Sequence, residues 1–181
     1  MTRLRPALLW TAVLAGALGL WAGTHLDRAP VADAAPPSVD VAEVGDLMPA
    51  LRLPDLSGAM LDLARFRGRP LLINVWASWC GPCVEEMPEL ARFAASQDSN
   101  GVQVLGLALD TPEGVHGFLQ RVPVDYPIVL DTPGPGDASV RLGNTRGLLP
   151  YSVLVDANGR IMRQKLGPFA PGEMDRWATA D

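Results

Sequence analysis

Two cysteines are the residues best suited to chemistry in this chain of 181 residues. Cys80 and Cys83 are its only cysteines, and just Gly81 and Pro82 separate them. A structural disulfide is expected to stabilise more as the loop it closes grows longer, and this pair closes almost none. A zinc site needs three or four protein ligands, whereas the chain adds only two histidines to the pair, so we expect no metal. The chemistry that remains is redox exchange between a dithiol and a disulfide. We expect no cofactor beyond the two sulfurs, since the sequence has no GxGxxG motif for binding a dinucleotide.

The sequence on both sides of the cysteines is consistent with this chemistry. Residues 71–77 (LLINVWA) are a continuous apolar run, which is typical of a strand buried on both faces. From residue 82 to about 96 apolar residues recur at helical spacing, and Pro88 is expected to kink this helix. Cys80 then lies at the start of the helix, where the macrodipole and free N–H groups favour a thiolate. Cys83 lies one turn on and can attack a mixed disulfide that Cys80 forms.

The pattern along the rest of the domain predicts an α/β fold with a central mixed sheet flanked by helices. The expected elements are an extended lead-in at 41–54, a short hairpin near 57–66, strands at 102–109 and 126–130, helices at 112–121 and within 134–143, a hairpin of strands at 151–155 and 160–165, and a terminal helix at 171–178.

The N-terminal segment differs in composition from the rest. Residues 7–23 contain no charged side chain, and an apolar run of about 20 residues is long enough to cross the ~30 Å bilayer core. Arg3 and Arg5 precede this run, which favours export of the C-terminal part. We therefore expect a single membrane-anchoring helix in residues 1–27, a Pro/Ala-rich linker at 28–38 and a catalytic domain at 39–181. The alternative is a signal peptide cleaved near residues 32–34, which leaves a soluble periplasmic protein. Both interpretations place the domain in the periplasm or on the outer side of the membrane.

The overall charge argues against one class of partner. The net charge is −5, and nucleic-acid binding requires a basic surface, so we expect no nucleic-acid partner.

The motif around the cysteines resembles that of the thioredoxin superfamily. The pattern W-x-x-W-C-G-P-C runs from Trp76 through Trp79 to Cys83. Within the superfamily the chain is most similar to the membrane-anchored thiol–disulfide oxidoreductases of the TlpA/ResA type. Glu-Met-Pro follows at 86–88, and Asn74 stands where thioredoxins keep a buried aspartate. Residues 147–161 (GLLPYSVLVDANGRI) contain the proline, Pro150, that family members hold in cis.

The resemblance implies a thioredoxin-like fold and a role for several residues. Pro150 and Leu149 are expected to face the cysteines and to present backbone to a client peptide, which pairs as an added strand. Trp79, Gly81 and Pro82 complete the expected client-binding surface.

The resemblance also places a carboxylate beside the cysteines. Glu86 is expected to tune the pKa of the pair and to relay a proton. A solvated helix glutamate is the alternative for Glu86. Asn74 is expected to be a hydrogen-bonded core residue, which cannot itself take up a proton.

The function that follows is reduction of disulfides in exported proteins, because Gly-Pro between the cysteines is the reducing type of dipeptide. The partners implied are exported proteins with disulfides, among them apocytochrome c or proteins of copper-site assembly, and a membrane thiol reductase that donates electrons. A disulfide oxidase or isomerase of the same fold and a peroxiredoxin-like peroxidase are alternatives. A peroxidase of this fold needs Thr or Ser three residues before its cysteine, where this chain has Ala77. A metallochaperone needs wider cysteine spacing and an added histidine. A scaffold without catalysis predicts that Cys80→Ser has no effect.

Overall fold

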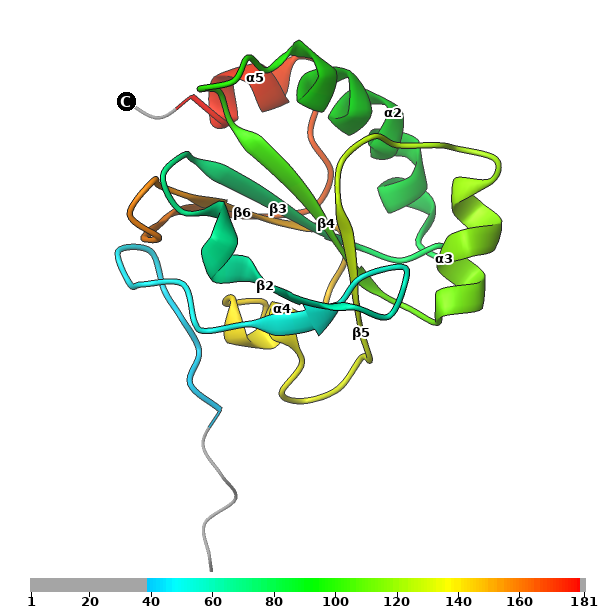
Figure 1. Cartoon of the computed structure of the whole chain (residues 1–181), viewed down its shortest axis with the longest axis horizontal. Helices are drawn as coiled ribbons and strands as arrows, with labels where there is room; N and C mark the ends of the chain where they lie inside the picture. Colours follow the sequence, from blue (N-terminus) through cyan, green and yellow to red (C-terminus); the bar gives the residue numbers. More distant parts are fainter. Residues whose placement is uncertain (1–38, 180–181) are drawn as a thin grey trace, which may run out of the picture. The chain divides into compact units, whose positions relative to one another are not determined.

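The computed structural model describes residues 39–179. Its centre is a five-stranded mixed sheet, and the cysteine pair follows the central strand of this sheet (Figure 1). The strand order is β5-β4-β3-β6-β7, with β3 at the centre. β3 pairs parallel with β4 and β4 with β5, while β6 runs antiparallel to both β3 and β7. The strands are β3 (Leu71–Trp76), β4 (Gln103–Leu109), β5 (Ile128–Asp131), β6 (Tyr151–Val155) and β7 (Ile161–Leu166).

The two faces of the sheet are covered by different elements, which gives three layers (Figure 1). Because side chains alternate along a strand, Ile73 and Val75 of β3 point to one face, and Leu72 and Trp76 point to the other. The helices α2 (Gly81–Ser96), α3 (Pro112–Leu119) and α5 (Glu173–Trp177) pack on the face of Leu72 and Trp76. The opposite face is covered by the hairpin of β1 (Arg52–Pro54) and β2 (Met60–Asp62), the 3-10 helix η1 (Leu63–Phe66) and α4 (Ala138–Arg141).

The predicted α/β fold with a mixed central sheet and flanking helices is confirmed, although some boundaries differ. The apolar run at 61–66 forms the end of β2 and then η1, because the Asp62 side chain accepts the Ala64 N–H and caps a helical turn. The terminal helix is shorter than predicted and begins at Glu173, after Gly172 adopts a left-handed conformation with φ 69°. α2 continues through Pro88, where one backbone hydrogen bond of the helix is lost.

The predicted anchor and linker at 1–38 lie outside the described residues. Across residues 39–179, no helix is both long and apolar enough to span a membrane.

Candidate active site

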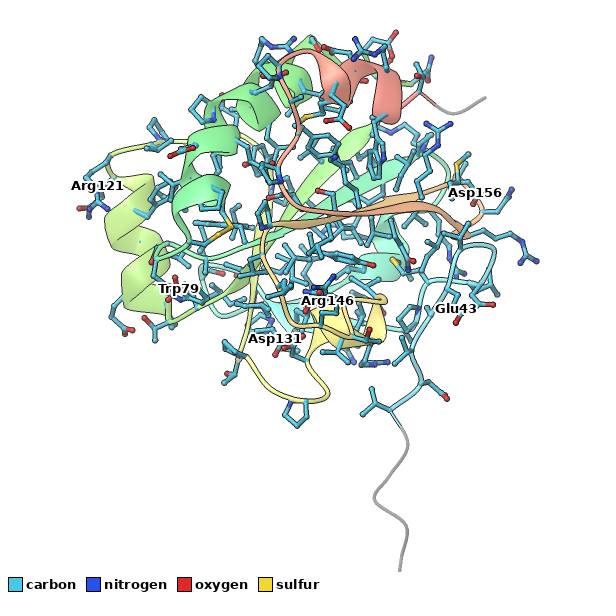
Figure 2. The ribbon with its side chains drawn as sticks, turned by 180° about the vertical axis from the view of Figure 1, so that it is seen from behind. Glu43, Trp79, Arg121, Asp131, Arg146 and Asp156 are labelled. Atoms are coloured by element: carbon cyan, nitrogen blue, oxygen red, sulfur yellow. A yellow bond between two sulfur atoms is a disulfide. The ribbon has the colours of Figure 1, made fainter. Side chains whose placement is uncertain are left out.

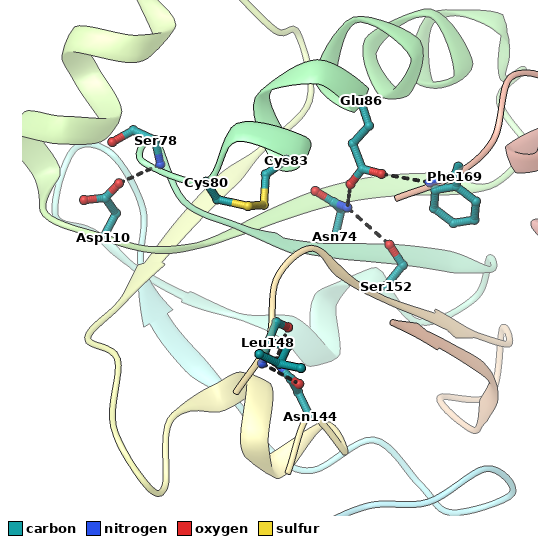
Figure 3. Close-up of a disulfide and its surroundings, with 10 residues drawn as sticks. All are labelled: Asn74, Ser78, Cys80, Cys83, Glu86, Asp110, Asn144, Leu148, Ser152 and Phe169. Atoms are coloured by element: carbon teal, nitrogen blue, oxygen red, sulfur yellow. Dashed lines mark hydrogen bonds between the residues drawn. A yellow bond between two sulfur atoms is a disulfide. The ribbon is translucent and has the colours of Figure 1, made fainter. Parts of the chain in front are cut away.

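The two cysteines form a disulfide where β3 passes into α2 (Figure 3). Cys80 is the N-cap of α2, and its carbonyl accepts the Val84 N–H at 3.1 Å, the first bond of the helix. Cys83 follows in the first turn, with the two Cα atoms 5.3 Å apart. Cys80 keeps 7% of its surface exposed, whereas Cys83 is fully buried. A visiting protein can therefore reach the sulfur of Cys80 first, and Cys83 is protected until the pair exchanges.

The loop before the cysteines is fixed by an aspartate that sequence reasoning missed. The Ser78 N–H donates to Asp110 Oδ2 at 2.7 Å (Figure 3). Asp110 directly follows β4, the parallel neighbour of β3, so the carboxyl ends of both strands meet at the same edge. An acid one residue after the neighbouring parallel strand is the signal that could have indicated it.

The two tryptophans of the motif have different environments. Trp76 is fully buried in β3 and packs against Phe118 of α3, with ring centroids 5.2 Å apart. Trp79 is 68% exposed and projects at the surface beside the cysteines (Figure 2). Gly81 and Pro82 are also exposed. Trp76 is thus a core residue, and the predicted client-contacting residues Trp79, Gly81 and Pro82 all lie at the surface.

The loop that ends in Pro150 lies at the same end of the sheet as the cysteines. The Leu149–Pro150 bond is cis, as the resemblance implied. Tyr151 of β6 pairs with Val75 of β3, so Pro150 lies level with the end of β3, from which the chain runs on to Cys80. Leu149 is partly buried against the cluster of side chains that contains both cysteines. The predicted client-binding residues Leu149 and Pro150 therefore lie at the same end of the sheet as the disulfide.

A buried asparagine holds this loop in place. Asn144 is 2% exposed, and its Nδ2 donates to the Leu148 carbonyl at 3.0 Å while its Oδ1 accepts the Leu148 N–H at 3.3 Å (Figure 3). The side chain thus pairs with both polar backbone groups of Leu148, a residue that is itself 45% exposed. No sequence pattern marks Asn144, because its partner is backbone.

Glu86 is buried next to the pair and is not a solvated helix residue. It is 6% exposed and faces the sheet one turn after Cys83. Asn74 Nδ2 donates to Glu86 Oε1 at 2.7 Å, and the Phe169 N–H donates to Oε2 at 3.1 Å (Figure 3). Burial raises the pKa of Glu86, and these two hydrogen bonds and the charge of Lys165 offset part of the rise.

The hydrogen bonds to Glu86 come from Asn74 and from the backbone of Phe169, and the sequence did not predict either bond. Asn74 of β3 is paired in register with Ser152 of β6, and its Nδ2 also donates to Ser152 Oγ at 3.2 Å. A polar residue in each of two apolar strands could have suggested this contact. Phe169 acts through its backbone, which leaves no sequence signal.

A pocket of about 230 Å³ connects this carboxylate to the surface. Glu86, Phe169 and Met174 line it, together with Pro82 beside the cysteines. The pocket provides a route by which a proton on Glu86 can exchange with solvent. Within residues 39–179, no cluster of three or more His, Cys, Asp or Glu side chains is arranged to hold a metal.

Comparison with known proteins assigns this arrangement to a family. The redoxin family model matches residues 43–180. The chain belongs to the redoxin family. The thiol-disulfide oxidoreductase ResA of Geobacillus kaustophilus is 31% identical over 134 residues, which are 74% of this chain and 75% of that protein.

Solved structures agree with this assignment. A Chlorobium tepidum protein described as a thiol:disulfide interchange protein DsbE is 27% identical, with a TM-score of 0.63 over 75% of this chain and 93% of the other. A thioredoxin-related protein from Neisseria meningitidis is 29% identical, with a TM-score of 0.61 over 68% of this chain and 93% of the other. This redoxin is therefore a thiol–disulfide oxidoreductase of the ResA/DsbE type, and its structure contains the Cys80–Cys83 disulfide.

Proposed function

We propose that this redoxin reduces disulfides in exported client proteins. The observation that carries the proposal is the unequal burial of the pair: Cys80 keeps 7% of its surface exposed, whereas Cys83 is fully enclosed beside a buried carboxylate. That asymmetry supports one sulfur for attack and the other for resolution. The apolar run at 7–23 supports an anchor and linker that hold the domain at 39–181 outside the cytoplasm.

The exchange proceeds in two displacements. The Cys80 thiolate attacks one sulfur of a client disulfide, and the second client sulfur leaves with the bonding pair and takes a proton. Cys83 then gives up its proton and attacks Cys80, so that the Cys80–Cys83 bond forms and the first client sulfur leaves as a thiolate. The client gains the two electrons that the cysteine pair loses, the Cys83 proton leaves through Glu86, and the client sulfurs take their protons from solvent.

Glu86 accepts the proton that Cys83 releases. Burial raises the pKa of this carboxyl, which brings its proton affinity closer to the range that acid–base transfer requires. The pocket beside Phe169 lets the proton pass to water.

The client binds across the exposed Trp79 and the Leu149–Pro150 loop, where its backbone pairs with the loop. The haem-attachment cysteines of apocytochromes c are the clients that the sequence resemblance favours. A membrane thiol reductase returns two electrons to the pair after each turnover.

The direction of electron flow is tested by the reduction potential of the full-length protein in detergent. The reduction potential of thioredoxin is about −270 mV, and that of strongly oxidising CxxC proteins is about −120 mV. We expect a value in the lower part of that range. A reduction potential of about −120 mV would contradict the reductase assignment and indicate an oxidase.

The mechanism is tested by two cysteine variants in the native host. Cys83→Ser is expected to accumulate mixed disulfides between Cys80 and clients, and Cys80→Ser is expected to form none and to lose turnover. A peroxide-consumption assay on the wild type separates the alternative, since rapid turnover of peroxide would indicate a peroxidase.

A further inference from the structure

Asn74 has one polar atom without a partner in the core beside the disulfide. The residue is fully buried in the middle of β3, on the face that packs against α2. Its Nδ2 donates to Glu86 and to Ser152, so both amide hydrogens are used. Its Oδ1 accepts no hydrogen bond from any described residue. Figure 3 shows this oxygen on the side of the amide that points toward the disulfide.

The orientation of the amide follows from its neighbours. An ionised carboxylate oxygen only accepts hydrogen bonds, so the amide nitrogen must face Glu86. The amide oxygen is thereby directed away from Glu86. A buried acceptor without a donor is unfavourable, and such atoms in native proteins call for an explanation.

The oxidised state explains the missing donor. Neither sulfur of a disulfide carries a hydrogen, so Cys83 cannot donate while it is bonded to Cys80. Reduction adds two electrons and two protons and breaks the S–S bond, which leaves a thiol on the buried Cys83. We propose that Asn74 Oδ1 accepts a hydrogen bond from the Cys83 thiol in the reduced protein. The inference deepens the proposed function and depends on it only in that the pair must be reduced during turnover.

The bond holds Cys83 as a thiol until a client is engaged. An acceptor oxygen next to the sulfur favours S–H over S⁻, so the thiolate of the reduced pair resides on Cys80. Once Cys80 is bonded to the client, the Cys83 proton passes to Glu86, which is held by the same amide. Asn74 thus orients both the donor and the acceptor of that proton without itself taking it up.

The S–H stretching band in the infrared tests this bond directly. In the full-length Cys80→Ser variant, Cys83 is the only thiol of the chain. We expect its band to be shifted to lower wavenumber than that of an unbonded thiol. Adding Asn74→Leu should return the band to the unbonded position. Adding Ser152→Ala, which removes another partner of the same amide, should leave the shift in place.

A second measurement uses the intact pair and does not rely on spectroscopy. In Asn74→Leu the disulfide form is relieved of an unpaired buried acceptor, and the dithiol form loses a hydrogen bond. Both effects favour the disulfide, so the dithiol–disulfide equilibrium with glutathione should move about tenfold toward the disulfide. For two electrons this is about 30 mV toward a more negative potential. The matched Ser152→Ala variant should move it far less.

The outcomes separate this inference from the proposed function. An unshifted S–H band in Cys80→Ser overturns the inference even if Asn74→Leu does not fold. A shifted band that survives Asn74→Leu also overturns it, because the acceptor is then another group. A shifted band in a protein that reduces no client disulfide leaves the inference standing and removes the reductase function.

Discussion

The loop in front of Pro150 offers a sharp separation of client binding from redox chemistry. Asn144→Ala removes the two hydrogen bonds, of 3.0 and 3.3 Å, that hold Leu148. Each is worth about 1 kcal/mol net, so the loop conformation loses about 2 kcal/mol. Because Leu148 is 45% exposed, its freed backbone groups can bind water. The unfolding free energy of the whole domain should therefore fall by only about 1–2 kcal/mol.

The expected kinetic result of Asn144→Ala is a fall in kcat/KM for a disulfide-bonded client of up to about 30-fold, since about 2 kcal/mol corresponds to that factor in an equilibrium. The fall should appear mainly in KM. The reduction potential should stay at the wild-type value, because the Asn144 side chain bonds to Ser139 and Leu148, neither of which belongs to the redox pair or its carboxylate. The assay follows client reduction by the full-length protein at several client concentrations.

Asn100→Ala is the matched control for this experiment. Asn100 is exposed and precedes the amino end of β4, at the opposite end of the sheet from the cysteines. It should leave both KM and the potential unchanged. If Asn144→Ala lowers thermal stability but leaves kcat/KM at the wild-type value, the loop has no part in client binding and the reasoning is refuted.

Three further predictions concern Glu86, Trp79 and the two tyrosines of the chain. Because burial raises the pKa of Glu86, the folded protein binds a proton there more tightly than the unfolded chain. The unfolding free energy of the wild type should therefore fall relative to that of Glu86→Gln as pH rises from about 4 through the pKa of Glu86 in the folded protein. The fall should be about 1.4 kcal/mol for each factor of ten by which the folded chain binds this proton more tightly than the unfolded chain. Urea denaturation at each pH measures the fall, and a constant difference between the two proteins would contradict the prediction. Trp79→Ala should change stability by less than about 0.5 kcal/mol, since the side chain is 68% exposed, yet should raise KM for the client; an unchanged KM contradicts its role in binding. Burial raises the pKa of Tyr151 to about 12 and also raises that of Tyr126. Alkaline titration should therefore show no tyrosinate absorbance near pH 10, and stability should decline as pH rises beyond about 10.

Local sequence was sufficient for the elements around the cysteines. The run at 71–77 and the helical spacing after Pro82 predicted β3 and α2, because apolar periodicity directly reflects which faces are buried. The 61–66 segment was harder to predict, because a side-chain cap at Asp62 decided that the chain turns into a 3-10 helix. Short apolar runs carry too little periodicity to distinguish these outcomes.

The sequence by itself determined the chemistry of this redoxin, since two sulfurs one helical turn apart after a buried strand are a local arrangement. Only the tertiary structure decided what surrounds them. Asn74 meets Glu86 across 12 residues and Ser152 across 78, and Phe169 reaches Glu86 across 83. Strand pairing and helix packing create these contacts, and a buried polar group must find its partner wherever the fold places one.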